Sequence, residues 1–287
     1  MRMSNRRESD NVEDRRGMSG ATKAGIGGIG GLLIAGLLML LGGGNISDVL
    51  NMAVSQMGNT ETVSAETFSE EQQELATFSS KVLAGTEDVW TKIFEQNGWE
   101  YKAPTMVLFT NSVQTGCGGA TSQVGPFYCS ADEKLYIDLT FFSEMQSQLG
   151  ASGDFAYAYV IAHEVGHHVE HMTGILSQAH QQMQKMSTEQ ANRISVRLEL
   201  LADFYAGVWA HHDNKMFNSL EDGDIEEAIR CAQVIGDDYL QKKARGYAQP
   251  ESFTHGTSAQ RLKWFKLGYQ TGDISRGNTF QLSDSQL

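Results

Sequence analysis

The chain has 287 residues, of which 40% are hydrophobic and 20% charged, and this composition fits a folded globular protein rather than a largely disordered one. Its formal net charge of −13 argues against a nucleic-acid partner, because proteins that bind nucleic acids present basic surfaces. Three cysteines without a CxxC pair exclude a disulfide-dense scaffold and a structural zinc ribbon.

The N-terminal region predicts a membrane anchor. Residues 1–23 carry six Lys or Arg against four acids, and residues 24–44 contain no charged residue. At about 1.5 Å per residue, such a segment just spans the roughly 30 Å apolar core of a bilayer. The positive-inside rule would place residues 1–23 in the cytoplasm and the chain after residue 45 across the membrane. We therefore expect a single-pass signal anchor over 24–44; a cleaved signal peptide and a soluble glycine-rich hinge are the alternatives.

A polar juxtamembrane linker is expected over 45–75, followed by one domain over 76–287. A capping box formed by Ser69 and Gln72 predicts a helix that ends near Asn97. Short apolar or β-branched runs predict strands at 104–110 and 135–140. Helical patterns follow at about 153–173, 188–212, 224–244 and 258–270. The predicted fold class is a helix-rich α+β domain with one small sheet, preceded by one transmembrane helix.

The cysteines fall in two kinds of segment. Cys117 and Cys129 lie in a glycine-rich loop between the two predicted strands, and outside the cytoplasm we expect them to form a disulfide. Two free thiols are the alternative. Cys231 lies in an apolar helical stretch, which predicts a small buried side chain.

One predicted helix carries a metal-binding motif, because residues 163–167 match HExxH. Side chains four residues apart share a helix face, so His163 and His167 can direct ring nitrogens at one zinc ion. Glu164 is then placed to take a proton from a metal-activated water. Gly166 costs about 1 kcal/mol inside a helix, which indicates that another segment or a substrate approaches closely there. A polar helix face without metal is the alternative.

A catalytic zinc needs a third protein ligand and an open coordination position. Glu199 is favoured, because it lies in an apolar helical stretch where an unpaired carboxylate would be costly. Asp203, four residues later on the same face, would then accept the second ring N–H of a zinc-binding histidine. A solvated acidic stripe is the alternative to both roles. The other candidates for the third ligand are His171, His180, Asp203, His211, His212 and His255.

Longer segments carry a resemblance to a known family. HEVGHHVEHMTG, ELLADFYAGVWA, DIEEAI, IGDDYLQ and PESFTHGTSAQRLKWF occur in this order. They resemble the bacterial "putative neutral zinc metallopeptidase" family over nearly the whole chain, least in residues 45–100. ELLAD also resembles the ExxAD motif of integral-membrane metallopeptidases. The resemblance implies a zincin-like peptidase in the bacterial inner membrane, with one zinc ion held by His163, His167 and Glu199 and with Glu164 as general base.

The stretch 250–261 is similar to the THPxxxxR motif of those ExxAD peptidases, except that Gly256 stands where they have proline. By this resemblance His255 would donate a hydrogen bond to the oxyanion of the tetrahedral intermediate. Arg261 would brace an acidic residue of the metal site.

We therefore expect a membrane-anchored zinc peptidase with its catalytic domain outside the cytoplasm, acting on peptide or protein substrates. An edge strand near residues 135–139 is expected to hold extended substrate by strand addition. The alternatives are a non-catalytic zinc-binding extracytoplasmic module, a zinc hydrolase of a non-peptide amide, and a di-iron carboxylate protein. A di-iron site needs a second ExxH, which Glu199 does not begin. The natural substrate and the oligomeric state are left open.

Overall fold

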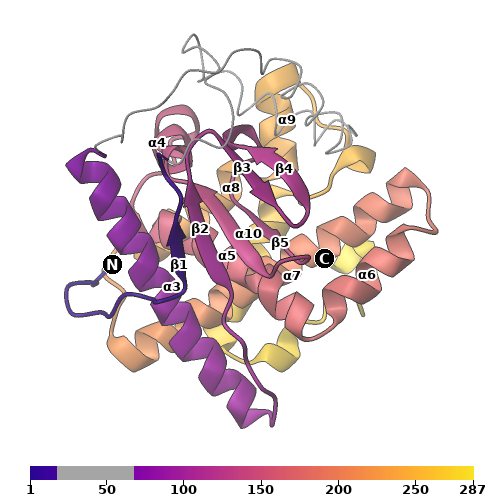
Figure 1. The fold of residues 1–287 in the computed structure, drawn as a ribbon. Helices are drawn as coiled ribbons and strands as arrows, with labels where there is room; N and C mark the ends of the chain where they lie inside the picture. The colour runs from indigo at the N-terminus through magenta and orange to yellow at the C-terminus, as the bar shows by residue number, and fades with distance from the viewer. Residues whose placement is uncertain (18–67) are drawn as a thin grey trace.

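The computed structural model describes residues 1–17 and 68–287 (Figure 1). Their strands are β1 (Val12–Asp14), β2 (Thr105–Phe109), β3 (Ser112–Thr115), β4 (Gly118–Thr121), β5 (Phe127–Cys129) and β6 (Lys134–Asp138). Their helices are α3 (Glu70–Gln96), α4 (Thr140–Glu144), α5 (Asp154–Met172), α6 (Ile175–Met183), α7 (Thr188–Phe217), α8 (Asp224–Val234), α9 (Asp237–Arg245) and α10 (Ser258–Thr271). The described part is thus helix-rich α+β with a small sheet, as predicted.

The main sheet has the strand order β1-β2-β6-β5, with β5 antiparallel to β6 and the other neighbours parallel. Its two faces are buried differently. Met106 and Leu108 of β2 face the helical core, whereas Val107 and Phe109 pack in a second cluster with Val113 of β3. Burial on both faces explains why the β2 sequence is continuously apolar rather than alternating.

The edge of this sheet is not where we predicted it. The strand expected at residues 135–139 is β6, and it is paired on both sides, with β2 and with β5. Strand addition requires a free edge, so β6 cannot hold substrate in that way. At this end of the sheet the terminal strand is β5, which is only three residues long and was not predicted.

The predicted transmembrane helix has no counterpart in the part of the chain that the structure describes. Among residues 1–17 and 68–287, none of the helices combines the length and the apolar character needed to cross a bilayer. The segment 24–44 and most of the predicted linker lie outside the described residues. The pairing of β1 with β2, in which Val12 lies opposite Met106, also contradicts the prediction of a single membrane crossing. One membrane crossing between residues 17 and 68 would separate these strands, so this part of the prediction was wrong.

The first residues instead belong to the folded domain. The guanidinium of Arg6 pairs with Asp213 of α7, with a distance of 2.7 Å from Nη2 to Oδ1. The Ser9 backbone N–H donates to Ser80 Oγ of α3, at 3.0 Å. The segment therefore forms an edge strand and a strap over α3, and it does not stand apart as a basic tail (Figure 1).

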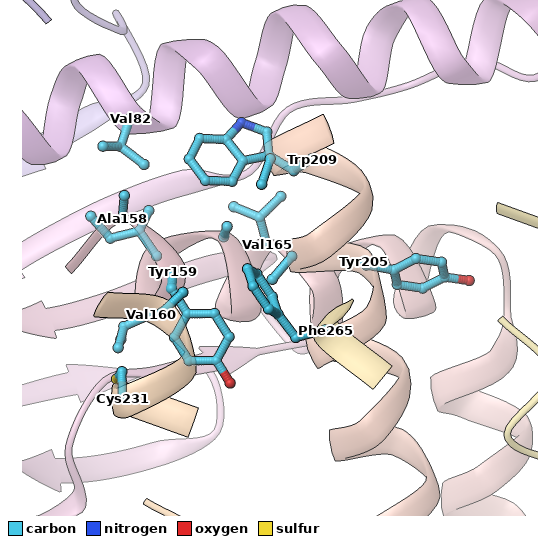
Figure 2. Close-up of a cluster of buried hydrophobic side chains, with 14 of the residues drawn as sticks. Val82, Ala158, Tyr159, Val160, Val165, Tyr205, Trp209, Cys231 and Phe265 are labelled. Atoms are coloured by element: carbon cyan, nitrogen blue, oxygen red, sulfur yellow. The ribbon is translucent and has the colours of Figure 1, made fainter. Parts of the chain in front are cut away.

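Helices α3, α5, α7, α8 and α10 enclose the main hydrophobic core. Figure 2 shows Val82 of α3, Tyr159 and Val165 of α5, Trp209 of α7 and Phe265 of α10 directed into one cluster. Each of these side chains has at most 1% of its surface exposed. Because α5 and α7 are buried against each other along their middle turns, polar residues on these turns face one another inside the protein.

Three glycines allow these helices to approach closely. A Cβ built on Gly166 of α5 would lie 2.9 Å from the backbone of Ala202 in α7, which is the close approach expected from the sequence. At the crossing of α7 and α10, a Cβ on Gly207 would lie 2.1 Å from Phe265 O, and one on Gly268 would lie 2.0 Å from Phe204 O. Helix α10 is thereby held close to α7.

Gly268→Ala is expected to lower the free energy of unfolding by about 3 kcal/mol, at the upper end of the usual overpacking cost, because the clash is with backbone that cannot rotate away. Urea unfolding followed by circular dichroism measures the change. The control is Gln270→Ala, an exposed position on the same helix, which should leave stability nearly unchanged. A loss below about 1 kcal/mol for Gly268→Ala would show that the helices separate easily.

A disulfide joins Cys117, at the turn between β3 and β4, to Cys129 of β5, as predicted. It fastens the β3–β4 hairpin to the terminal strand of the main sheet, next to the small apolar cluster that contains Cys129. Cys231 of α8 is a free, fully buried thiol, which also agrees with the prediction.

Candidate metal centre

The two histidines of the HExxH motif lie one turn apart on the buried face of α5, opposite Glu199 of α7. The Nε2 atom of His163 lies 3.2 Å from Glu199 Oε2, and the Nε2 atom of His167 lies 3.5 Å from Glu199 Oε1. One ligand atom from each of these three residues lies within 4.8 Å of the other two. The structure therefore brings together the three side chains that the sequence singled out.

The other ring nitrogen of each histidine is hydrogen-bonded to a buried carboxylate. The Nδ1 atom of His163 lies 2.9 Å from Asp203 Oδ1, and the Nδ1 atom of His167 lies 2.9 Å from Glu170 Oε2. Ionised carboxylates only accept hydrogen bonds, so both Nδ1 atoms carry the proton and both Nε2 atoms are left for a ligand. Carboxylates hold metal-binding histidines in this way in many metalloproteins.

Asp203 is the centre of a buried network that links three helices. Besides His163, it accepts hydrogen bonds from Tyr159 of α5 and from two guanidinium nitrogens of Arg261 on α10, at 2.8 and 2.9 Å. Asp203 is fully buried, and Arg261 is 3% exposed. A two-pronged ion pair of this kind compensates a buried charge and fixes the orientation of the carboxylate.

The electrostatics of the cluster favour a cation. Burial alone would lower the pKa of His163, but Asp203 and then Glu199 outweigh it and raise this pKa to about 9. Burial is likewise outweighed at His167, whose pKa is raised by Glu170 and Glu199. Burial raises the pKa of Glu170 to about 7, against the opposing influence of His167. Three carboxylates around two imidazoles therefore stabilise positive charge at the centre of the cluster.

The residues present fit a zinc ion. Two imidazole nitrogens and one glutamate form a ligand set of known catalytic zinc sites, which leave one position open. The Nε2 atoms face Glu199, while the second ring nitrogens are already engaged. The other acidic group of suitable spacing in the described residues is Asp154, Asp224 and Glu227, which offers only carboxylates. That all-oxygen set does not suit zinc as well.

Glu164 lies at the same cluster but is not engaged in it. Glu164 is 7% exposed, and its carboxylate makes no hydrogen bond to any described residue. Burial raises the pKa of Glu164, although the charges of His163 and His167 oppose this effect. A carboxylate that is near the ligands, free of partners and shifted toward protonation is suited to proton transfer.

His255 lies in the loop between α9 and α10, with 27% of its side chain exposed. Burial alone would lower the pKa of His255, but Glu199 raises it, which shows that the ring is within electrostatic reach of the cluster. Gly256 has a φ angle of +88°, which proline cannot adopt because its ring fixes φ near about −65°. The backbone at this point therefore differs from a THP loop, so the match to that motif, already partial in sequence, is partial in conformation too.

Three residues around the cluster were not predicted. Glu170 follows His167 by three positions on the same helix, a spacing at which side chains meet, so the pair could have been found from the sequence. Tyr159 precedes His163 by one turn in the same way. Asp237, at the start of α9, hydrogen-bonds the backbone of the His255 loop, and no sequence spacing indicates this contact.

Proteins with similar sequences occur in bacteria. The chain is 46% identical to the "Uncharacterized protein YpfJ" of Escherichia coli K12 over 289 aligned positions, covering 98% of this chain and 99% of that protein. It is 44% identical over 194 positions to "Uncharacterized protein Mb2605" of Mycobacterium bovis, covering 64% of each. No solved structure matches the chain significantly. The family model described as "Putative neutral zinc metallopeptidase" matches residues 1–280, and the chain therefore belongs to that family.

Proposed function

We propose that this protein is a zinc-dependent peptidase whose metal is held by His163, His167 and Glu199. One observation carries the proposal: two Nε2 atoms converge on one carboxylate, while each Nδ1 is held by a separate buried carboxylate. The test is hydrolysis of unfolded casein by the purified protein after loading with zinc. Activity that a chelator removes and zinc restores is expected, and zinc binding without hydrolysis would favour a non-catalytic module.

The side chains suggest how the reaction proceeds. A zinc ion held by His163, His167 and Glu199 would supply a Lewis acid to polarise the scissile carbonyl. Glu164 takes the proton of the attacking water and passes it to the leaving amine, a role for which its unengaged carboxylate is suited. His255 donates a hydrogen bond to the oxyanion that develops as water adds. Asp203 and Glu170 keep the two imidazoles oriented throughout.

We propose that the enzyme binds its substrate as an extended peptide that forms main-chain hydrogen bonds with β5. This strand is at one end of the sheet order, and Tyr128 at its centre donates a hydrogen bond to His168 Nδ1 on α5, at 2.9 Å. The terminal strand is therefore tied to the helix that carries the metal ligands. Peptides N-methylated singly around the scissile bond should lose cleavage at the positions that pair with β5, because N-methylation removes a main-chain donor. Equal cleavage of all of them would exclude strand pairing.

An extracytoplasmic location remains a proposal, now supported by the disulfide instead of by a single membrane crossing. Disulfides persist in oxidising compartments and are rare in the cytosol. Alkylation of protein taken directly from cells, followed by unfolding, should detect one free thiol, that of Cys231. Three free thiols would contradict this location.

Glu199→Ala is expected to lower the zinc content of micromolar protein from one ion per chain to well below one, because it removes one of three protein ligands. Elemental analysis after gel filtration measures the metal content. Glu189→Ala is the matched control, because Glu189 is an exposed residue on the first turn of the same helix. Full zinc occupancy in the Glu199 variant would remove this residue from the ligand set.

A further inference from the structure

The loop that carries His255 is anchored by one carboxylate. Asp237, the first residue of α9, is fully buried. Its Oδ2 atom accepts hydrogen bonds from the backbone N–H groups of Thr254, His255 and Gly256, at 2.8, 2.7 and 2.9 Å. Its own N–H donates to Gly256 O at 2.9 Å, so the loop and the start of α9 are locked together.

The second oxygen of this carboxylate faces the imidazole. Asp237 Oδ1 lies 3.3 Å from His255 Nδ1, is buried, and accepts no hydrogen bond from any described group. The hydroxyl of Thr254 is 2.9 Å from the same Nδ1, and a hydroxyl can donate or accept. An ionised carboxylate can only accept, so the arrangement favours the ring form in which Nδ1 carries a proton.

Charged groups on three helices face His255. Asp237 of α9 and Glu199 of α7 are negative, whereas Arg261 of α10 is positive. With a proton held on Nδ1, the ring has an Nε2–H only when it is an imidazolium. The carboxylate of Asp237, 3.3 Å from Nδ1, favours that charged form against the repulsion from Arg261, and it does so whether or not Glu199 binds a metal ion. A charged donor stabilises an oxyanion more strongly than a neutral one.

We propose that Asp237 is a positioning residue that keeps Nδ1 of His255 protonated and thereby presents Nε2–H to the oxyanion of the substrate. The expected effect on peptide hydrolysis rests on the proposed function, whereas the expected protonation of the His255 ring does not. Asp237→Asn tests it well, because the asparagine oxygen can still accept the three backbone N–H groups. Its amide nitrogen then donates to Nδ1, which favours the neutral ring with the proton on Nε2 instead.

The first measurement does not depend on activity. Protein labelled with ¹⁵N-histidine and loaded with zinc gives ring correlations by NMR, and His255→Gln identifies the His255 signals by their absence. Near neutral pH we expect both nitrogens of His255 to be protonated in the wild type, and Nδ1 to lose its proton in Asp237→Asn. An unprotonated Nδ1 in the wild type would overturn the proposal, whether or not the protein cleaves peptides.

The second measurement uses a quenched fluorescent casein peptide. Asp237→Asn is expected to lower kcat about tenfold or more with little change in KM, as for the loss of part of an oxyanion donor. In the His255→Gln background the same change should have no further effect. Asp238→Asn is the matched control, because Asp238 accepts hydrogen bonds from Ser258 instead of facing His255. An equal loss in both backgrounds would show that Asp237 acts only as a structural anchor.

Discussion

Glu164→Gln is expected to lower the rate of peptide hydrolysis by about 100-fold to 10,000-fold, the range for loss of a general base, while the protein keeps its zinc. The amide has the size of the carboxylate but cannot take a proton from water. Because no other described residue hydrogen-bonds this side chain, the substitution leaves the surrounding network intact. Hydrolysis of casein and zinc content, measured on the same preparation, separate the two effects.

The control for this prediction is a second carboxylate whose pKa is also raised by burial. Burial raises the pKa of Glu144 to about 6, but the residue lies on α4, outside the metal cluster. Glu144→Gln should leave both zinc content and hydrolysis near the wild-type level. Undiminished hydrolysis in Glu164→Gln would remove its role as general base, and loss of zinc would mean that it helps to hold the metal.

The ligand set could be predicted because its parts are local. His163, Glu164 and His167 lie within one helical turn, and the apolar residues around them predict a buried helix. Glu199 and Asp203 are also one turn apart, in an apolar segment where unpaired acids would be costly. The close approach at Gly166 follows from the same reasoning, because a glycine in a strong helix needs a neighbouring backbone.

The order of the strands could not be predicted in this way. β1 consists of Val12, Glu13 and Asp14, and two charged residues give it no strand pattern of its own. It becomes a strand only by pairing with β2, more than 90 positions along the chain. β5 is equally short and was not predicted from the sequence. The sequence therefore predicted β6 as an edge strand, although β5 pairs with it. Short strands take their conformation from distant partners rather than from local preference.

The break between α8 and α9 shows the same limit. The apolar pattern predicted one helix over 224–244, but α8 ends at Val234 and α9 begins at Asp237. Gly236 lies between them, and a Cβ there would be 2.4 Å from Ser258 N at the start of α10. A tertiary contact therefore ends the helix. The same contact sets the position of Asp237, which explains why its role near His255 could not be predicted.

Asp203→Ala is expected to have the largest effect on stability, about 3–5 kcal/mol in the zinc-free protein, which is typical when a buried ion pair loses one partner. It leaves Arg261 buried and without its carboxylate partner, and Tyr159 and His163 without an acceptor. Zinc affinity should also fall by about 10-fold to 100-fold, as for other outer carboxylates of metal-binding histidines. Urea unfolding with a chelator present and a separate zinc titration measure the two effects.

A double variant separates the lost hydrogen bonds from the unpaired charge. Asp203→Ala combined with Arg261→Met removes both charges and keeps most of the buried volume, so it should be more stable than Asp203→Ala alone. Its zinc affinity should stay low, because His163 still lacks its acceptor at Nδ1. If the two stability losses simply add, the ion pair is not what stabilises this part of the core. If zinc affinity recovers in the double variant, then zinc binding in Asp203→Ala is weakened by the unpaired charge of Arg261. It is then not weakened by the loss of the carboxylate that orients His163.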